Sequence, residues 1–160
     1  MVKRALGKTG LAVSPVGLGT VKLGRKTDVR YPRDFELPDD ETARQLLALA
    51  ADLGINLIDT APAYGNAEER LGRLLPGQRD DWIIATKVGE NYEPATGSRF
   101  DFTPEGIRQS IDASLRALQT DYLDVVSIHS DGRDLDLIER GTIEVPVSYT
   151  HLRAHETLLD

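Results

Sequence analysis

The chain has 160 residues, of which 40% are hydrophobic and 28% are charged, and its formal net charge is −7. These proportions indicate a globular domain with a real core, and the negative charge favours neither nucleic-acid nor anionic-membrane binding. The sequence has no cysteine, which excludes disulfides, thiolate nucleophiles and Cys-ligated zinc. It shows no signal peptide and no membrane-spanning apolar run, so we expect a soluble cytoplasmic protein.

Hydrophobic periodicity and turn residues divide the chain into alternating strands and helices. In the first half of the chain, the sequence predicts a hairpin at 2–14, a strand at 16–20, a polar loop at 21–38, a helix capped by Asp39 or Asp40 and ending at Leu53, and a strand at 55–59. A helix near 67–75, a turn at 76–81 and a strand at 82–87 follow. The rest is a polar loop to about residue 102, a helix from Thr103, a strand at 122–128 and a helix start at 134–140. The strands lack alternation and are rich in Ile and Val, which is typical of parallel strands covered by helices.

Two helices carry further local signals. The first has four apolar residues on one face and Gly54 at its stop position; they are Leu46, Leu47, Ala50 and Leu53. The second begins with a capping Thr103 followed by Pro104 at the first helical position. Its apolar residues at helical spacing are Ile107, Ile111, Leu115 and Leu118.

Ionisable side chains stand where three of the predicted strands end. Asp59 ends one strand, Lys87 ends the next and His129 closes the last, while Tyr64 follows Asp59 after five residues. Taken singly, each has an ordinary structural explanation: Asp59 as a turn residue, Lys87 as a solvated lysine and His129 as a structural histidine. Tyr64 could be an aromatic residue at the rim. Catalytic groups of a (β/α) barrel lie at this end of successive strands, so their coincidence favours a barrel active site. A flavodoxin-like sheet also fits the alternation of elements.

These four groups suit the chemistry of a carbonyl. The Lys87 ammonium would lower the pKa of the Tyr64 phenol, and Asp59 would hold that ammonium in place. His129 could orient a carbonyl oxygen or share the proton. The four residues include no nucleophile and do not form a metal-binding set, so a hydride from a nicotinamide is the natural source of electrons.

Several motifs, in order, resemble those of the aldo-keto reductases, over roughly residues 2–141. They are Asp59-Thr60-Ala61-x-x-Tyr64-Gly65 with Glu68-Glu69-x-Leu71-Gly72, Ala85-Thr86-Lys87-Val88-Gly89, Ile128-His129-Ser130, and the opening segments Leu6-Gly7-Lys8-Thr9-Gly10-Leu11 and Val16-Gly17-Leu18-Gly19-Thr20. The first resembles the family signature, and Asp59, Tyr64, Lys87 and His129 resemble its catalytic tetrad.

The resemblance implies an α/β fold, the (β/α)8 TIM barrel, and an NADP(H)-dependent oxidoreductase that reduces aldehyde or ketone carbonyls to alcohols. Tyr64 would be the general acid, with Lys87, Asp59 and His129 tuning and orienting it. Tyr64 and His129 would bind the small-molecule carbonyl substrate. The residues implied near the nicotinamide and its ribose are Gly19, Thr20, Val21 and Asp59.

The chain departs from this family at its end. The family barrel has eight strands, whereas residues 1–145 predict about four βα units, so we expect the N-terminal half of a TIM-barrel domain that is inactive by itself. Residues 146–160 resemble a translated transposase sequencing adapter, since 147–156 match one of its reading frames, and we expect them to be a non-native tail.

The same tail contains a pattern that could suggest zinc. His151 and His155 are four residues apart with Glu156 adjacent, but the order is not H-E-x-x-H and no third ligand is evident. We therefore predict no metal.

Two other functions compete with the reductase. One is a non-catalytic, nicotinamide-binding regulatory subunit of the same fold. The other is a metal-dependent barrel hydrolase, which would need paired His or carboxylate ligands at several strand ends.

Overall fold

The core of the computed structural model is a four-stranded parallel sheet with the strand order β3-β4-β5-β8. The structure describes residues 1–29, 31–132, 136 and 139. Every sheet neighbour is also the next of these strands along the chain, which is the order of a barrel wall and differs from the flavodoxin-like order. The strands are β3 (Leu18–Gly19), β4 (Leu57–Asp59), β5 (Ile83–Val88) and β8 (Val125–Ile128).

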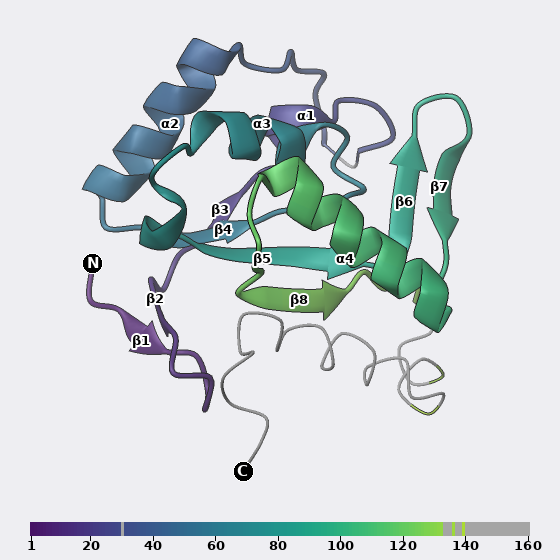
Figure 1. The fold of residues 1–160 in the computed structure, drawn as a ribbon. Helices are drawn as coiled ribbons and strands as arrows, with labels where there is room; N and C mark the ends of the chain where they lie inside the picture. Colours follow the sequence, from purple (N-terminus) through teal and green to yellow (C-terminus); the bar gives the residue numbers. More distant parts are fainter. Residues whose placement is uncertain (30, 133–135, 137–138, 140–160) are drawn as a thin grey trace.

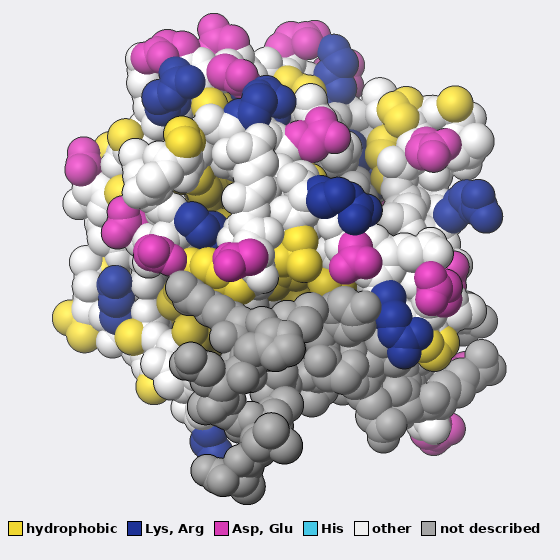
Figure 2. Space-filling view, viewed as in Figure 1, with side chains coloured by type: hydrophobic (Ala, Val, Ile, Leu, Met, Phe, Trp, Pro, Cys, Tyr) yellow, Lys and Arg dark blue, Asp and Glu magenta, His cyan; other side chains and the backbone are white. Residues whose placement is uncertain are grey.

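Three helices connect these strands and lie together on one face of the sheet (Figure 1). They are α2 (Asp40–Asp52), α3 (Ala67–Leu74) and α4 (Pro104–Leu118). A doubly wound sheet would place helices on both faces, so this arrangement also agrees with a barrel segment. Lys and Arg side chains are interspersed with Asp and Glu on the face seen in Figure 2, and neither sign forms a continuous patch there.

The caps predicted for α2 and α4 are confirmed. The side chain of Asp39 accepts a hydrogen bond from the amide of Thr42, and that of Thr103 accepts one from Gly106. Each bond satisfies an amide that lacks a partner within the helix. Gln119 ends α4 in the left-handed conformation, with φ of 53°.

The predicted N-terminal hairpin is also present, as β1 (Arg4–Ala5) and β2 (Ala12–Val13). It lies near the end of the sheet where the parallel strands begin (Figure 1). Asn56, which precedes β4, fixes it there. The Asn56 side chain accepts a hydrogen bond of 2.7 Å from the amide of Ser14 and donates one of 2.9 Å to the carbonyl of Ala12.

The main core cluster lies between the helices and the sheet, and it corrects one prediction about α2. Ala43, Leu47 and Ala50 of this helix are buried, whereas Leu46 and Leu53 are 39% and 55% exposed. At 100° per residue, Leu46 and Leu53 stand about 40° and 60° round the helix from Ala50, the nearer edge of the buried arc. Apolar spacing alone therefore predicted too wide a face.

Two segments predicted as loops contain regular structure. The loop at 21–38 begins with a short helix, α1 (Val21–Gly24), and the polar segment after β5 forms an antiparallel hairpin of β6 (Glu90–Glu93) and β7 (Gly97–Phe100). Gly97 has a φ of 75°, which a turn of this kind requires. Polar composition concealed the hairpin, because its side chains are mostly exposed.

Smaller differences concern element ends. A short 3₁₀ turn forms at Arg79–Asp81, and β8 begins at Val125, later than predicted. Of the helix start predicted at 134–140, only residues 136 and 139 are described, and both are helical. The predicted tail at 146–160 lies outside the described residues. Within the described ranges, no helix is long and apolar enough to span a membrane.

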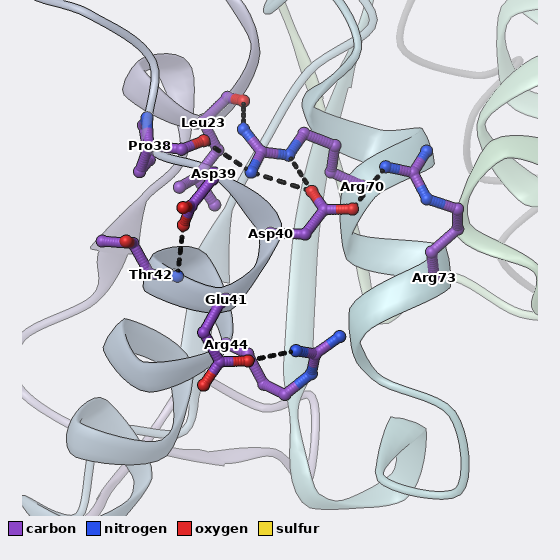
Figure 3. Close-up of polar contacts among 9 residues, drawn as sticks. All are labelled: Leu23, Pro38, Asp39, Asp40, Glu41, Thr42, Arg44, Arg70 and Arg73. Carbon is purple, nitrogen blue, oxygen red and sulfur yellow. Dashed lines mark hydrogen bonds and ion pairs between the residues drawn. The ribbon is translucent and has the colours of Figure 1, made fainter.

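Arg70 of α3 ties the segment before α2 to the helical layer (Figure 3). Its side chain is 6% exposed. It donates hydrogen bonds to the carbonyls of Leu23 at 2.6 Å and Pro38 at 2.7 Å, and to a carboxylate oxygen of Asp40 at 2.9 Å. Both ends of the segment 24–38 are therefore held by one guanidinium.

We predict that Arg70→Ala lowers the free energy of unfolding by about 2–4 kcal/mol, because two carbonyls and a carboxylate lose their buried donor. Urea denaturation measures the change. Arg73→Ala is the matched control, since Arg73 lies on the same helix and contacts Asp40 but is 49% exposed. Equal losses from the two variants would contradict the role given to Arg70.

Candidate active site

The carboxyl ends of β4, β5 and β8 bring three of the predicted site residues together. Asp59 is the last residue of β4, Lys87 is the penultimate residue of β5 and His129 directly follows β8. The parallel register sets their relative heights, with Asp59 beside Ala85 and Lys87 beside Ser127. Because the three strands run parallel, their carboxyl ends, and with them these side chains, lie at one edge of the sheet.

Lys87 lies at the centre of the group. Its Nζ donates hydrogen bonds to Oδ1 of Asp59 at 2.6 Å and to the carbonyl of Thr60 at 3.1 Å. The same Nζ lies 4.8 Å from the centroid of the Tyr64 ring. The Lys87 side chain is 17% exposed and that of Asp59 is 47% exposed. The ammonium therefore lies between a carboxylate and the aromatic ring of the phenol.

Tyr64 stands on a turn that packs closely against α1. Its amide donates a hydrogen bond of 3.0 Å to the carbonyl of Ala61, and Gly65 continues the turn with a φ of 63°. A Cβ placed on Gly24 of α1 would lie 2.3 Å from the Tyr64 carbonyl oxygen. Only a residue without a side chain allows this approach, so Gly24 helps to set the position of the phenol.

His129 completes the group from the other side. Its ring lies 5.9 Å from the Tyr64 ring, measured between centroids, and perpendicular to it. Its Nδ1 lies 3.0 Å from Oε2 of Glu90. Burial lowers the pKa of His129, with a further lowering by the Lys87 charge, and the Glu90 carboxylate acts in the opposite direction. The imidazole is therefore neutral at neutral pH.

Glu90 is a functional candidate that the sequence analysis did not single out. It is 9% exposed and begins β6, directly after Gly89, whose φ of 106° turns the chain out of β5. Its Oε1 accepts a hydrogen bond of 2.5 Å from the Ser98 hydroxyl and lies 3.6 Å from Nη1 of Arg25. The only feature of the sequence that could have pointed to Glu90 is its place as an acidic residue soon after the strand that carries Lys87.

The residues implied at the nicotinamide lie beside this group. Gly19 pairs with Asp59 across β3 and β4, and Thr20 donates from both its amide and its hydroxyl to the Asp59 carbonyl. Nothing lies within 4 Å of a Cβ built on Gly19, so a flat ring can approach the backbone there. The half-exposed Asp59 carboxylate can accept a hydrogen bond from a ribose hydroxyl. Val21 follows, half-buried, at the start of α1. These residues fit that end of the cofactor.

A model of the aldo/keto reductase family matches residues 15–150. The chain belongs to the aldo/keto reductase family. It is 40% identical to L-galactose dehydrogenase of Arabidopsis thaliana over 152 residues, which are 92% of this chain and 41% of that protein. It is 33% identical to D-threo-aldose 1-dehydrogenase of a Pseudomonas species over 156 residues, which cover 83% of this chain and 45% of that protein.

Solved structures of aldo-keto reductases share its fold. A putative aldo-keto reductase from Pseudomonas aeruginosa has 53% identity and a TM-score of 0.82, covering 91% of this chain and 54% of that one. A holo-form aldo-keto reductase from Bacillus halodurans has 32% identity and a TM-score of 0.72, covering 94% and 48%. The chain spans about half the length of the curated relatives it matches, and its parallel α/β sheet corresponds to about half of the family's TIM barrel.

In the described ranges, no three His, Asp or Glu side chains are grouped so that they could hold a metal ion. His151 and His155, the pair whose spacing could suggest zinc, lie outside those ranges.

A buried carboxylate supports the strand that carries Lys87. Glu68 of α3 is 5% exposed, and it accepts hydrogen bonds from the hydroxyls of Thr86 at 2.5 Å and Ser114 at 3.1 Å. Burial raises the pKa of Glu68, an effect that outweighs these two bonds and the Lys87 charge. Glu68 thus joins α3, β5 and α4 directly beneath the site, a role that its motif did not reveal.

The raised pKa of Glu68 predicts a pH-dependent stability. The folded protein holds this proton more tightly than the unfolded chain, so the stabilisation is present below the ordinary carboxyl pKa and is lost as the pH rises through the raised value. Glu68→Gln stays neutral and keeps a donor and an acceptor. We therefore expect the variant to gain stability relative to wild type as the pH rises from about 4 to 7.

Urea denaturation at several pH values measures this difference. Glu69→Gln is the control, because Glu69 is the exposed neighbour on α3. A difference that does not change with pH for Glu68→Gln would contradict the account.

Proposed function

We propose that the complete protein reduces aldehyde or ketone carbonyls to alcohols with NADPH, and that Tyr64 is the general acid. The observation that carries the proposal is the Lys87 ammonium, 2.6 Å from the Asp59 carboxylate and 4.8 Å from the Tyr64 ring centroid. Membership of an oxidoreductase family supports it. A nearby ammonium attracts the negative charge that develops on a phenol as it gives its proton to a substrate.

Each residue then has a role in moving one proton. Tyr64 donates its phenolic proton to the carbonyl oxygen as negative charge develops there, and Lys87 stabilises the phenolate that remains. Asp59 keeps the ammonium in place, and His129, whose ring faces Tyr64, orients the substrate oxygen. When bound beside Gly19, Thr20, Val21 and Asp59, a reduced nicotinamide supplies the hydride to the carbonyl carbon, so the balanced products are an alcohol and NADP⁺.

Sugars are the first substrates to test. L-galactose dehydrogenase and D-threo-aldose 1-dehydrogenase are both named for sugars. An aldose offers a carbonyl to reduce, and a polyol offers an alcohol to oxidise. A small panel of aldoses, polyols and simple aldehydes therefore tests the reaction in both directions.

We predict that Tyr64→Phe lowers kcat/KM for carbonyl reduction by at least about a hundredfold, because the acid is lost. Nicotinamide affinity should stay close to that of wild type. The assay follows NADPH oxidation by the complete protein. Because residues 146–160 resemble a translated sequencing adapter, its gene is first re-sequenced across the Pro146 codon from template that carries no adapter. Tyr122→Phe is the control, since Tyr122 contacts Asp80 before β8 begins, at the far end of the sheet.

Full activity of Tyr64→Phe would contradict the proposed acid. Nicotinamide binding without turnover of any carbonyl or alcohol would favour the regulatory-subunit alternative instead.

The 160-residue chain by itself is expected to be inactive, because the family barrel and most of its cofactor contacts need about twice this length. Measurable NADPH oxidation by the purified chain, above that of its Tyr64→Phe variant, would show that this half suffices.

A further inference from the structure

We propose that Arg25 is a positioning residue for Tyr64, which it holds through the peptide unit that joins Ala63 to Tyr64. Arg25 directly follows α1 and is 9% exposed. The inference rests on the proposed function, because it concerns how the phenol is kept at the place from which it gives up its proton.

Both polar ends of that peptide unit are bonded. The Tyr64 amide donates a hydrogen bond of 3.0 Å to the carbonyl of Ala61, and the Ala63 carbonyl accepts one of 3.0 Å from Nη1 of Arg25. The six atoms of a peptide unit lie in one plane, and the Cα of Tyr64 is one of them. The two bonds therefore fix how this plane is rotated, and with it the direction in which the phenol leaves the chain.

The Ala63 carbonyl depends on Arg25 because the residue is shut off from solvent. Ala61 and Ala63 are both 0% exposed. A buried carbonyl that loses its donor is costly, so the peptide unit would rotate toward another donor if the guanidinium were removed. Such a rotation would move the Tyr64 side chain.

The guanidinium is itself held in one orientation. Its Nε and Nη2 donate hydrogen bonds to the carbonyls of Thr27 at 3.0 Å and Asp28 at 3.1 Å. The ring of Tyr92 on β6 stacks against it, with the centroid 3.4 Å from Cζ, and the Tyr92 hydroxyl donates to Oδ2 of Asp28 at 3.0 Å. The donors of a planar guanidinium keep fixed directions, so these contacts aim Nη1 at the turn that carries Tyr64.

Arg25 could instead serve only the loop that follows α1. Two of its three carbonyl acceptors, those of Thr27 and Asp28, belong to that loop. An ion pair with Glu90 does not account for Nη1, which lies 3.6 Å from Oε1, beyond hydrogen-bond distance. Nη1 is bonded to Ala63, 38 residues along the chain. The one carbonyl bond that leaves the loop is thus the one that reaches the candidate acid.

This arrangement links the β6–β7 hairpin to Tyr64. The hairpin contacts Arg25 through Tyr92, and Arg25 contacts the turn that carries the phenol. A displacement of about 1 Å in a reacting group can cost about a hundredfold in rate. The placement of the guanidinium should therefore matter more than its charge, and a lysine, which keeps the charge but lacks the planar fork, should not replace Arg25.

The first test is ¹⁹F NMR of the complete protein labelled with 3-fluorotyrosine, with Tyr64→Phe to assign the Tyr64 signal. We expect Arg25→Lys and Arg25→Met to shift or broaden this signal. The signal of Tyr122, at the far end of the sheet, should stay unchanged. Lys26→Met is the matched control, because Lys26 is the neighbouring cation and pairs with Glu36 at the surface. It should leave both signals as in wild type.

The second test is kinetic. We expect Arg25→Lys to lower kcat for carbonyl reduction by about tenfold and Arg25→Met to lower it further, with nicotinamide affinity close to that of wild type. If Arg25 acts through the phenol, its effect should largely disappear in the Tyr64→Phe background, whereas independent effects would multiply.

If neither Arg25 variant folds, Tyr92→Leu serves instead, because it removes the ring that stacks on the guanidinium. It should shift the Tyr64 signal and lower kcat in the same direction. Tyr92→Phe keeps the ring and is its control, with a smaller change expected.

An unchanged Tyr64 signal in the Arg25 variants, or losses from the Arg25 and Tyr64 substitutions that multiply, would overturn the inference. The two proposals can fail separately. Absence of turnover by the wild type would refute the proposed function, while the fluorine signal reports on Arg25 and Tyr64 without any substrate.

Discussion

The contact between Lys87 and Asp59 is the interaction on which the rest of the site depends. It joins two neighbouring strands at 2.6 Å and holds the ammonium under the Tyr64 ring. Lys87 is largely buried, so its charge needs a fixed partner, and a half-exposed carboxylate supplies one while remaining open to a ligand. The parallel register makes the contact possible, because it sets Asp59 beside Ala85, two residues before Lys87 on β5.

Polar groups buried in the helical layer join the elements that carry the site. Arg70 ties α1 and the start of α2 to α3, and Glu68 ties α3 to the strand and the helix that flank Lys87. Such groups are costly to bury unless they are fully bonded, and each has two or more partners. Their bonds allow few alternative packings, and so favour one arrangement of the turn that carries Tyr64.

The β6–β7 hairpin brings further polar side chains to the same edge of the sheet. It follows Lys87 in the chain and carries Glu90 to the side of His129. Arg25, from the segment after α1, braces the hairpin by stacking on Tyr92. Three segments distant in sequence therefore meet near one imidazole.

The sequence by itself determined the class of fold and that Asp59, Lys87 and His129 stand where strands end. Non-alternating strands, helix caps and ionisable residues at strand ends can each be recognised from a few neighbouring residues. Asp59 and Tyr64 likewise lie only five residues apart in one motif. Only the tertiary structure decided that Glu90 faces His129 and that Leu46 stands outside the core. Such contacts join residues far apart in the chain and depend on how whole elements pack, which no local pattern records. In the sequence, Glu68 looks like an ordinary residue of a helix surface. Its burial becomes evident only from its hydrogen bonds to Thr86 and Ser114.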